Sequence, residues 1–206
     1  MKRNYDNVAP FYDRLARLIY GRTLIDAQVF LLKAIPPNAK ILVVGGGTGW
    51  ILEEIAHIHP SGLTITYVDI SVKMIDLAKK RNAGENSITF INAPIQEAVI
   101  NNTFNVVITP FLLDNFTEDT IPKIFSQMHN LLTPKGLWLY CDFQNTNFLW
   151  QRAILKMMYL FFRSLCGIES NRLPNIDAHF TQEGYKTLAE NTFAKGFIIS
   201  RAYAKG

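Results

Sequence analysis

The sequence predicts an α/β fold built on a doubly wound, mostly parallel sheet with helices on both faces. Three observations predict it. Short runs rich in Val and Ile, typical of buried parallel strands, alternate with segments whose apolar residues repeat at helical spacing. The first such run, residues 40–44, meets a glycine-rich turn at once. The length of 206 residues suits one domain that buries enough surface to need no disulfide or metal.

Two helices are expected ahead of the sheet. Apolar residues repeat at helical spacing over residues 8–19, and Gly21 ends that helix. A second helix is expected over residues 23–35, where Pro36 and Pro37 stop it.

Five strands and three helices should follow. Ser71 and Thr117 are expected to cap two of the helices by accepting a free backbone N–H. Residues 133–136 read as a turn before the fifth strand. The expected strands are 40–44, 63–68, 87–91, 104–109 and 137–142, and the expected helices are 51–58, 71–81 and 117–132.

The remaining chain breaks this rhythm. Residues 148–162 form a helix that is apolar nearly all round, residues 181–193 look helical, and 196–203 is the one strand expected after them. We therefore expect a single domain over 1–206. Its parts are a helical cap (1–36), a ligand-binding core (37–142), a helical insert or lid (143–180) and a C-terminal helix and strand (181–206).

Composition excludes several classes of protein. The chain has 49% apolar and 18% charged residues, which excludes a disordered protein, a collagen and a coiled coil. The net charge is +4, but the basic residues are scattered along the chain. Their one cluster, residues 79–81, suits a helix C-terminus, so no nucleic-acid partner is expected. The two cysteines show no metal-ligand spacing, so no metal is predicted. No secretion signal or membrane-spanning stretch is expected, which favours the cytoplasm.

The strongest chemical signal is the run Gly45-Gly46-Gly47-Thr48-Gly49 between a strand and a helix. Glycines let the backbone come close to a ligand, and the free N–H groups of the next helix face it. The loop lacks the Gly-Lys-Ser/Thr ending of a phosphate loop, and Trp50 occupies the third glycine position of a dinucleotide fingerprint. Asp69 closes the second strand, where a carboxylate can accept both hydroxyls of a ribose.

These residues resemble the class I S-adenosylmethionine-dependent methyltransferases, whose fold is Rossmann-like. Residues 44–50 are similar to that family's first motif and residues 68–71 to its acidic turn. Residues 131–136 resemble the turn before its fifth strand, and the segments 5–13 and 20–21 resemble the start of the ubiquinone/menaquinone-biosynthesis type. The resemblance covers residues 5–142.

The resemblance implies an enzyme (EC 2.1.1.-) that transfers a methyl group from S-adenosylmethionine to a small acceptor, with a hydrophobic acceptor left open. It implies that the glycines hold the methionine part of the cofactor, Asp69 the ribose, Ile70 the adenine edge, and Thr109 and Pro110 the base of the sulfonium site. The cofactor-binding residues implied are Tyr12, Tyr20, Gly45, Gly46, Gly47, Thr48, Gly49, Asp69, Ile70, Ala93, Pro94, Ile95, Thr109 and Pro110.

Two departures keep alternatives open. Val43 stands where the family usually has an acid, and Pro94 where it often has an Asp. A cofactor-binding but non-catalytic interaction module is one alternative, and a nicotinamide-dependent oxidoreductase, against which Trp50 speaks, is the second. No catalytic residue is assigned: Asp114 and Asp142 are placed where a base could act, and His179 is the histidine to test.

Two places suggest a homodimer. The family normally ends with an antiparallel strand inserted between strands five and six, and only one strand is expected after residue 193. Either a direct contact replaces the final strand pair, or another chain covers the exposed edge. The apolar helix, within 148–166, could instead be a lid, a membrane-surface element, a dimer interface or simply packed on the sheet.

Overall fold

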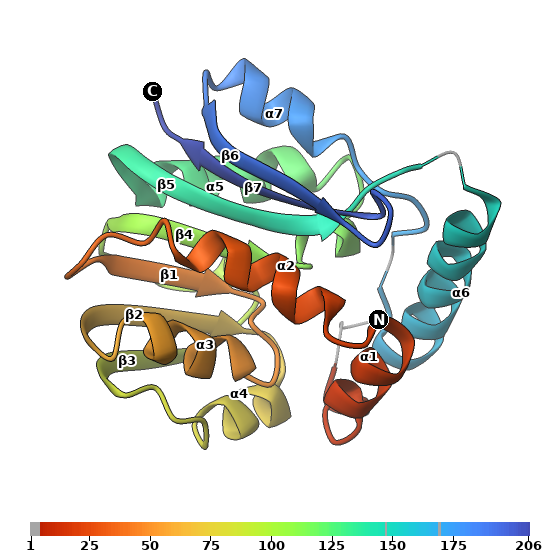
Figure 1. The fold of residues 1–206 in the computed structure, drawn as a ribbon, viewed down its shortest axis with the longest axis horizontal. Helices are drawn as coiled ribbons and strands as arrows, with labels where there is room; N and C mark the ends of the chain where they lie inside the picture. Colours follow the sequence, from red (N-terminus) through yellow and green to blue (C-terminus); the bar gives the residue numbers. More distant parts are fainter. Residues whose placement is uncertain (1–4, 147, 169) are drawn as a thin grey trace.

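A seven-stranded sheet runs through the molecule in the order β3-β2-β1-β4-β5-β7-β6 (Figure 1). The computed structural model describes residues 5–146, 148–168 and 170–206. The expected cap (1–36) and insert (143–180) extend over positions that lie outside these described residues. The strands are β1 (Lys40–Val44), β2 (Ser61–Asp69), β3 (Glu85–Asn92), β4 (Phe104–Pro110), β5 (Leu132–Phe143), β6 (Lys186–Phe193) and β7 (Ile198–Ala204).

Strands β1 to β5 are parallel, and β7 pairs antiparallel with both β5 and β6. This confirms the predicted doubly wound, mostly parallel sheet. The helices are α1 (Tyr12–Tyr20), α2 (Thr23–Leu32), α3 (Trp50–Ile58), α4 (Val72–Ala78), α5 (Ile121–Leu131), α6 (Leu149–Cys166) and α7 (Ile176–Gln182), with short 3-10 turns at Ile95–Glu97 and Leu113–Asn115.

Alternation along the strands divides the core into two layers. In β1, Ile41 and Val43 pack among residues of α2, α3 and α4, whereas Leu42 and Val44 pack among residues of α5 and α7. Helices therefore pack against both faces of the sheet.

Local capping explains where two helices begin and end. The Ser71 hydroxyl accepts a hydrogen bond from the Met74 N–H, as predicted, and Gly21 ends α1 with a φ of 59°. The prediction that Thr117 caps the next helix is wrong. Helix α5 begins at Ile121, and the Thr117 carbonyl accepts from residues 120 and 121, closing a turn ahead of it.

The prediction of a helix over 181–193 and of a missing final strand is wrong. Helix α7 ends at Gln182, and two strands follow it, β6 and β7, where a single strand was expected. Strand β6 is an edge strand whose residues are mostly exposed, so it carries no apolar alternation to signal a strand. Because β7 is paired on both sides, the reason for expecting a dimer at the C-terminal sheet edge falls away.

The turn expected at 133–136 lies within β5, where the pairing with β4 jumps from Leu132 to Leu137 and Lys135 has a φ of 60°. Strand β5 therefore contains a local irregularity, and its pairing with β4 is interrupted there.

Helix α6 is longer and more exposed than the sequence suggests. Only Gln151, Leu155, Tyr159 and Cys166 are buried on it, while large apolar side chains such as Leu149 and Leu160 face outward. The expectation that a helix apolar nearly all round must be buried is therefore wrong for this face of α6.

Within the described residues, no helix combines the length and the apolar character that crossing a membrane requires.

Candidate functional site

A cavity of about 1040 Å³ lies at the carboxyl ends of β1, β2 and β4. Helices α1 and α6 lie beyond these strand ends and supply its other wall (Figure 1). Ligands of doubly wound sheets bind at this edge. The volume is at the upper end of the roughly 300–1,000 Å³ of ordinary ligand pockets. The cavity therefore has room for more than one small molecule.

The glycine loop forms one side of the cavity. Gly47 has a φ of 62°, and a Cβ added there would meet no atom within 4 Å, so its backbone is open to a ligand. Gly49 has a φ of 80° at the start of α3, and a Cβ there would lie 2.6 Å from the Ala78 Cα. One glycine thus opens the loop to the cavity, and the other lets α3 approach α4.

Asp69 ends β2 and turns its carboxylate toward the glycine loop. Its Oδ2 accepts from the Gly47 N–H at 3.1 Å, and its Oδ1 accepts from the Ser71 N–H at 2.9 Å. Burial raises the pKa of Asp69 to about 6, although these two hydrogen bonds oppose the rise. The carboxylate is held in place and retains acceptor capacity toward the cavity, which it lines.

The segment before α1 folds across the mouth of this site. The Ser71 hydroxyl donates to Asp6 Oδ1 at 2.5 Å, and the Tyr5 hydroxyl donates to Asn115 Oδ1 at 2.8 Å. Both Tyr5 and Asp6 line the cavity. The sequence marked this segment only by resemblance, and nothing in the pattern showed that these side chains reach residues 65 and 110 positions away.

A second polar contact fixes α1 to the glycine loop. Asp13 accepts from the Thr48 hydroxyl at 2.6 Å and from Arg81 Nη2 at 2.7 Å, while Arg81 Nε donates to the Thr48 carbonyl at 3.0 Å. From the sequence, residues 79–81 are interpreted as cations that favour a helix C-terminus. Arg81 has a further role, because it lies after α4 and links that segment to α1 and to the glycine loop.

The structure brings most of the predicted binding residues into the cavity wall, although no bound ligand tests their roles. Those that line the cavity are Tyr12, Tyr20, Gly45, Gly47, Asp69, Ile70, Ala93, Pro94 and Ile95. Those that are not among its lining residues are Gly46, Thr48, Gly49, Thr109 and Pro110.

Four of the five residues outside the lining, all but Pro110, have another role in the packing or hydrogen bonding of the site. A Cβ on Gly46 would collide with the Tyr67 hydroxyl, so this glycine makes room for Tyr67. Thr109 is fully buried, and its hydroxyl accepts from the Trp138 indole N–H at 2.9 Å. The positions after it, Phe111 and Leu112, reach the cavity instead.

Two buried carboxylates lie at the ends of β4 and β5, with different surroundings. Asp142 accepts from the backbone N–H groups of residues 113, 114 and 143 at 2.8–3.2 Å, so it fixes the turn after β4. Asp114 lines the cavity, and its Oδ1 accepts from the Asn115 side chain at 2.7 Å. Burial, and secondarily the charge of Asp142, raises the pKa of Asp114.

Other candidate groups are placed elsewhere. His179 packs against the Phe125 ring on the α5–α7 side and does not line the cavity. Val43, at the position where the resemblance would expect an acid, is fully buried in the core. No cluster of three metal-ligating side chains occurs among residues 5–146, 148–168 and 170–206.

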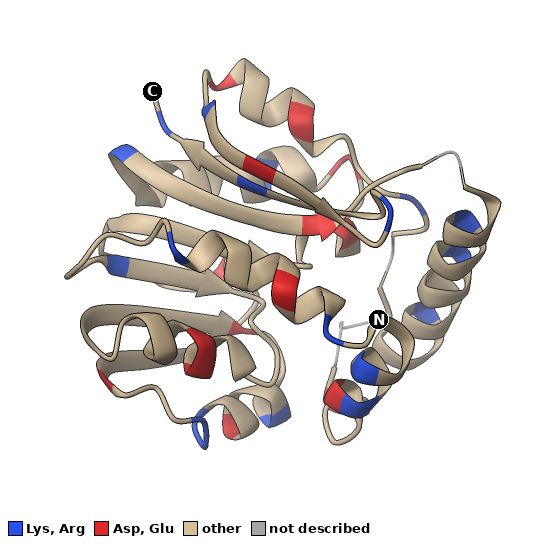
Figure 2. Ribbon diagram, in the orientation of Figure 1, with Lys and Arg blue, Asp and Glu red and all other residues tan. Residues whose placement is uncertain are grey.

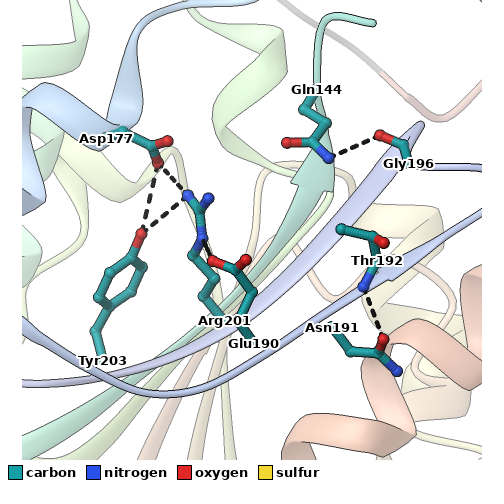
Figure 3. A network of polar contacts seen from close by, with 8 residues as sticks. All are labelled: Gln144, Asp177, Glu190, Asn191, Thr192, Gly196, Arg201 and Tyr203. Carbon is teal, nitrogen blue, oxygen red and sulfur yellow. Dashed lines mark hydrogen bonds and ion pairs between the residues drawn. The ribbon is translucent and has the colours of Figure 1, made fainter.

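A separate polar network lies at the β7–β6 edge of the sheet (Figure 3). Arg201 on β7 donates to Asp177 on α7 and to Glu190 on β6, and the Tyr203 hydroxyl joins them. Since both carboxylates already neutralise this guanidinium, the network ties β6 and α7 to β7 rather than offering a free anion site.

The sequence matches the family model "Methyltransferase domain" over residues 41–136. The ubiquinone/menaquinone biosynthesis C-methyltransferase UbiE of Geotalea daltonii is 29% identical over 164 residues, covering 77% of this chain and 67% of the relative. The malonyl-[acyl-carrier protein] O-methyltransferase of Priestia megaterium is 27% identical over 192 residues, covering 92% of this chain and 66% of the relative. The chain thus spans about two thirds of the length of these curated relatives.

A solved structure shares the fold. The 1,6-didemethyltoxoflavin-N1-methyltransferase of Burkholderia thailandensis, solved with S-adenosylhomocysteine, superposes with a TM-score of 0.66 at 14% identity, covering 96% of this chain and 84% of the other. Sheet order, the glycine loop, the acid at the end of β2 and the match over residues 41–136 agree. Residues 41–136 therefore match a methyltransferase domain, and the chain has the Rossmann-like fold of a solved methyltransferase.

Proposed function

We propose that this protein transfers the methyl group of S-adenosylmethionine to a small apolar acceptor. The observation that carries the proposal is one continuous cavity with two unlike ends. Gly47 and Asp69 supply a polar end, and α1 and α6 supply an apolar one. In this proposal the whole chain works as one methyltransferase unit, with α1 and α6 as the cap of the site.

The residues at the polar end fit the cofactor. The Asp69 carboxylate can accept the ribose hydroxyls, the open backbone at Gly47 leaves room for the amino-acid part, and Ile70, Ala93 and Ile95 offer apolar contact to the adenine. The cofactor held there would supply a methyl group from its sulfonium: a bond from the acceptor atom to the methyl carbon would form as the carbon–sulfur bond broke, with S-adenosylhomocysteine as the leaving group. The chain's own part is to bind and align the two molecules and exclude water.

The apolar end suits the acceptor. Ile154, Met158 and Phe162 of α6 line it, and the Tyr20 hydroxyl lies 3.6 Å from the Met158 Sδ. Methionine side chains adapt to ligands of irregular shape. These features support an apolar acceptor that is held mainly by shape and burial.

Asp114 is the side chain we propose as proton acceptor for an acceptor atom that must lose a proton. It lines the cavity, whereas Asp142 is occupied by three backbone N–H groups. Because the pKa of Asp114 is raised, the methyl-transfer rate should increase with pH as this carboxyl ionises. The Asp114→Asn variant should lose this pH dependence and kcat while its KM for the cofactor stays unchanged.

Calorimetry tests the cofactor part directly. S-adenosylmethionine and S-adenosylhomocysteine should bind the wild type, and Asp69→Ala should cost about 1.5–3 kcal/mol of binding free energy, as for hydrogen bonds to a charged group. Asp76→Asn, an exposed change on α4, is the control. Equal affinity of wild type and Asp69→Ala, with both folded by circular dichroism, would contradict the proposed part of Asp69.

A further inference from the structure

The outward face of α6 carries two adjacent stripes of different character. At about 100° per residue, Leu149, Met157 and Leu160 fall within one arc of about 100° that also includes Trp150. Their exposed fractions are 78% for Leu149, 62% for Met157 and 68% for Leu160. Large apolar side chains are rarely grouped in this way on a surface that only meets water.

The second stripe is cationic. Arg152, Lys156 and Arg163 are exposed and lie within about 40° of one another around the helix axis, beside the apolar arc. Helix α6 contains no Asp or Glu, and Figure 2 shows only blue segments along it. Among the residues that the structure describes, none of these three cations forms an ion pair.

The inward face of the same helix forms the apolar wall of the cavity. Met157 is both exposed and part of the lining, so it lies at the cavity mouth. Ile19 of α1 has the same two properties, with 48% of its surface exposed, and α1 packs on α6 through Tyr12 and Phe162. The exposed apolar surface is therefore continuous with the entrance to the site.

We propose that this face of α6 docks on the surface of an anionic lipid bilayer. A helix lying in the membrane plane buries an apolar stripe among the lipid chains and places Lys and Arg among the headgroups. The unpaired cations beside the apolar stripe complement an anionic surface and argue against a second copy of this face, which would bring like charges together. Docking would set the cavity mouth against the lipid.

This inference goes beyond methyl transfer and does not depend on it, because binding to vesicles requires neither cofactor nor turnover. Flotation with vesicles of phosphatidylcholine alone, and with vesicles that also contain phosphatidylglycerol, measures it. We expect the wild type to bind the anionic vesicles, to bind phosphatidylcholine alone far more weakly, and to lose affinity as salt screens the charges.

Two pairs of variants assign the binding to α6. Leu160→Glu should lower vesicle affinity more than about tenfold, whereas Leu188→Glu, a control on β6 with a similar exposure of 62%, should leave it unchanged. Removing Arg152 and Lys156 together (both to Gln) should cost about fivefold per charge. The same double change at the exposed Lys123 and Lys186 should cost little.

Several outcomes would overturn the proposal. One is a wild-type protein that binds S-adenosylhomocysteine but does not bind anionic vesicles. A second is an equal loss of vesicle affinity in Leu160→Glu and Leu188→Glu. A third is a protein that binds no vesicles and forms a dimer in light scattering, which Leu160→Glu dissociates. Vesicle binding without cofactor binding would instead contradict the proposed function and leave the docking surface standing. Thermal unfolding of each variant checks that the surface changes leave the fold intact.

Discussion

Arg81 Nη2 donates to Asp13 Oδ2 at 2.7 Å and so ties the segment after α4 to helix α1. The Thr48 hydroxyl donates to the other oxygen of the same carboxylate at 2.6 Å. One carboxylate of helix α1 thus holds together this helix, the glycine loop and the segment after α4. Helix α1 and the glycine loop cannot shift independently while these bonds persist.

Breaking this contact should weaken ligand binding more than folding. The pair is partly exposed, so Arg81→Leu should lower the free energy of unfolding by no more than about 1 kcal/mol. The affinity for S-adenosylhomocysteine should fall several-fold, because α1 and the loop lose their shared anchor. Calorimetry and urea unfolding measure the two effects. Arg22→Leu, which breaks the exposed pair with Asp26, should change neither.

Cofactor binding should depend on pH through Asp69. The pKa of Asp69 is raised to about 6, so below that pH the carboxyl is protonated and cannot accept both ribose hydroxyls. Affinity should be full above pH 6 and fall by up to about tenfold per unit below it. At pH 6, binding should release about half a proton, seen as a dependence of the calorimetric enthalpy on the buffer. A flat affinity from pH 5 to 8 would count against this.

The same shift has the opposite sign for stability. The folded protein holds the Asp69 proton more tightly than the unfolded chain, whose Asp titrates near pH 3.9. The stabilisation from this site is therefore complete below about pH 4 and is lost as the pH rises through about 6. In urea unfolding between pH 7 and pH 4, the wild type should gain stability relative to Asp69→Asn as the pH falls, and no such gain should occur above about pH 6.

Two glycines of the loop should respond differently to alanine. Both have positive φ, so both variants carry a strain of about 1–2 kcal/mol. Gly49→Ala should lose about 2 kcal/mol more, since its Cβ would meet Ala78 backbone at 2.6 Å. Gly47→Ala should keep its fold but bind S-adenosylhomocysteine at least about tenfold more weakly, because its methyl group would point toward the ligand. Thermal unfolding and calorimetry separate the two, and the reverse pattern would contradict this assignment.

Thr109 should matter for stability and not for binding. Thr109→Val leaves the fully buried Trp138 N–H without an acceptor, which should cost about 1–3 kcal/mol. Adding Trp138→Phe should cost less in this background than in the wild type, as a double-mutant cycle would show. Since Thr109 is not among the cavity-lining residues, S-adenosylhomocysteine affinity should be unchanged. A large loss of affinity would restore the original prediction for Thr109.

Local patterns predicted the parallel half of the fold well. Strands β1 and β4 are buried runs rich in Val and Ile, the glycine loop follows β1, and Asp69 closes β2 at the predicted place. Edge strand β6 could not be predicted in this way, because Lys186–Phe193 is mostly exposed and contains residues such as Leu, Ala and Glu that favour helices. A strand that buries few side chains leaves little periodic signal.

The candidate site was predictable only where it is built from residues close in the sequence. The contacts of Asp6 with Ser71 and of Tyr5 with Asn115 join distant segments, and no local pattern marks them. Thr109 lies near the end of β4, as predicted, but no local pattern marks that its hydroxyl accepts from Trp138, a buried donor on the neighbouring strand.

The placement of β7 between β5 and β6 has a consequence for how the protein is made. While the ribosome is still synthesising residues 198–204, β5 has no neighbour on its outer flank and β6 has nothing to pair with. The nascent chain can thus assemble strands β1 to β5 early. The seven-stranded sheet is complete only after β7, which follows β6 in the sequence but lies between β5 and β6, has left the exit tunnel.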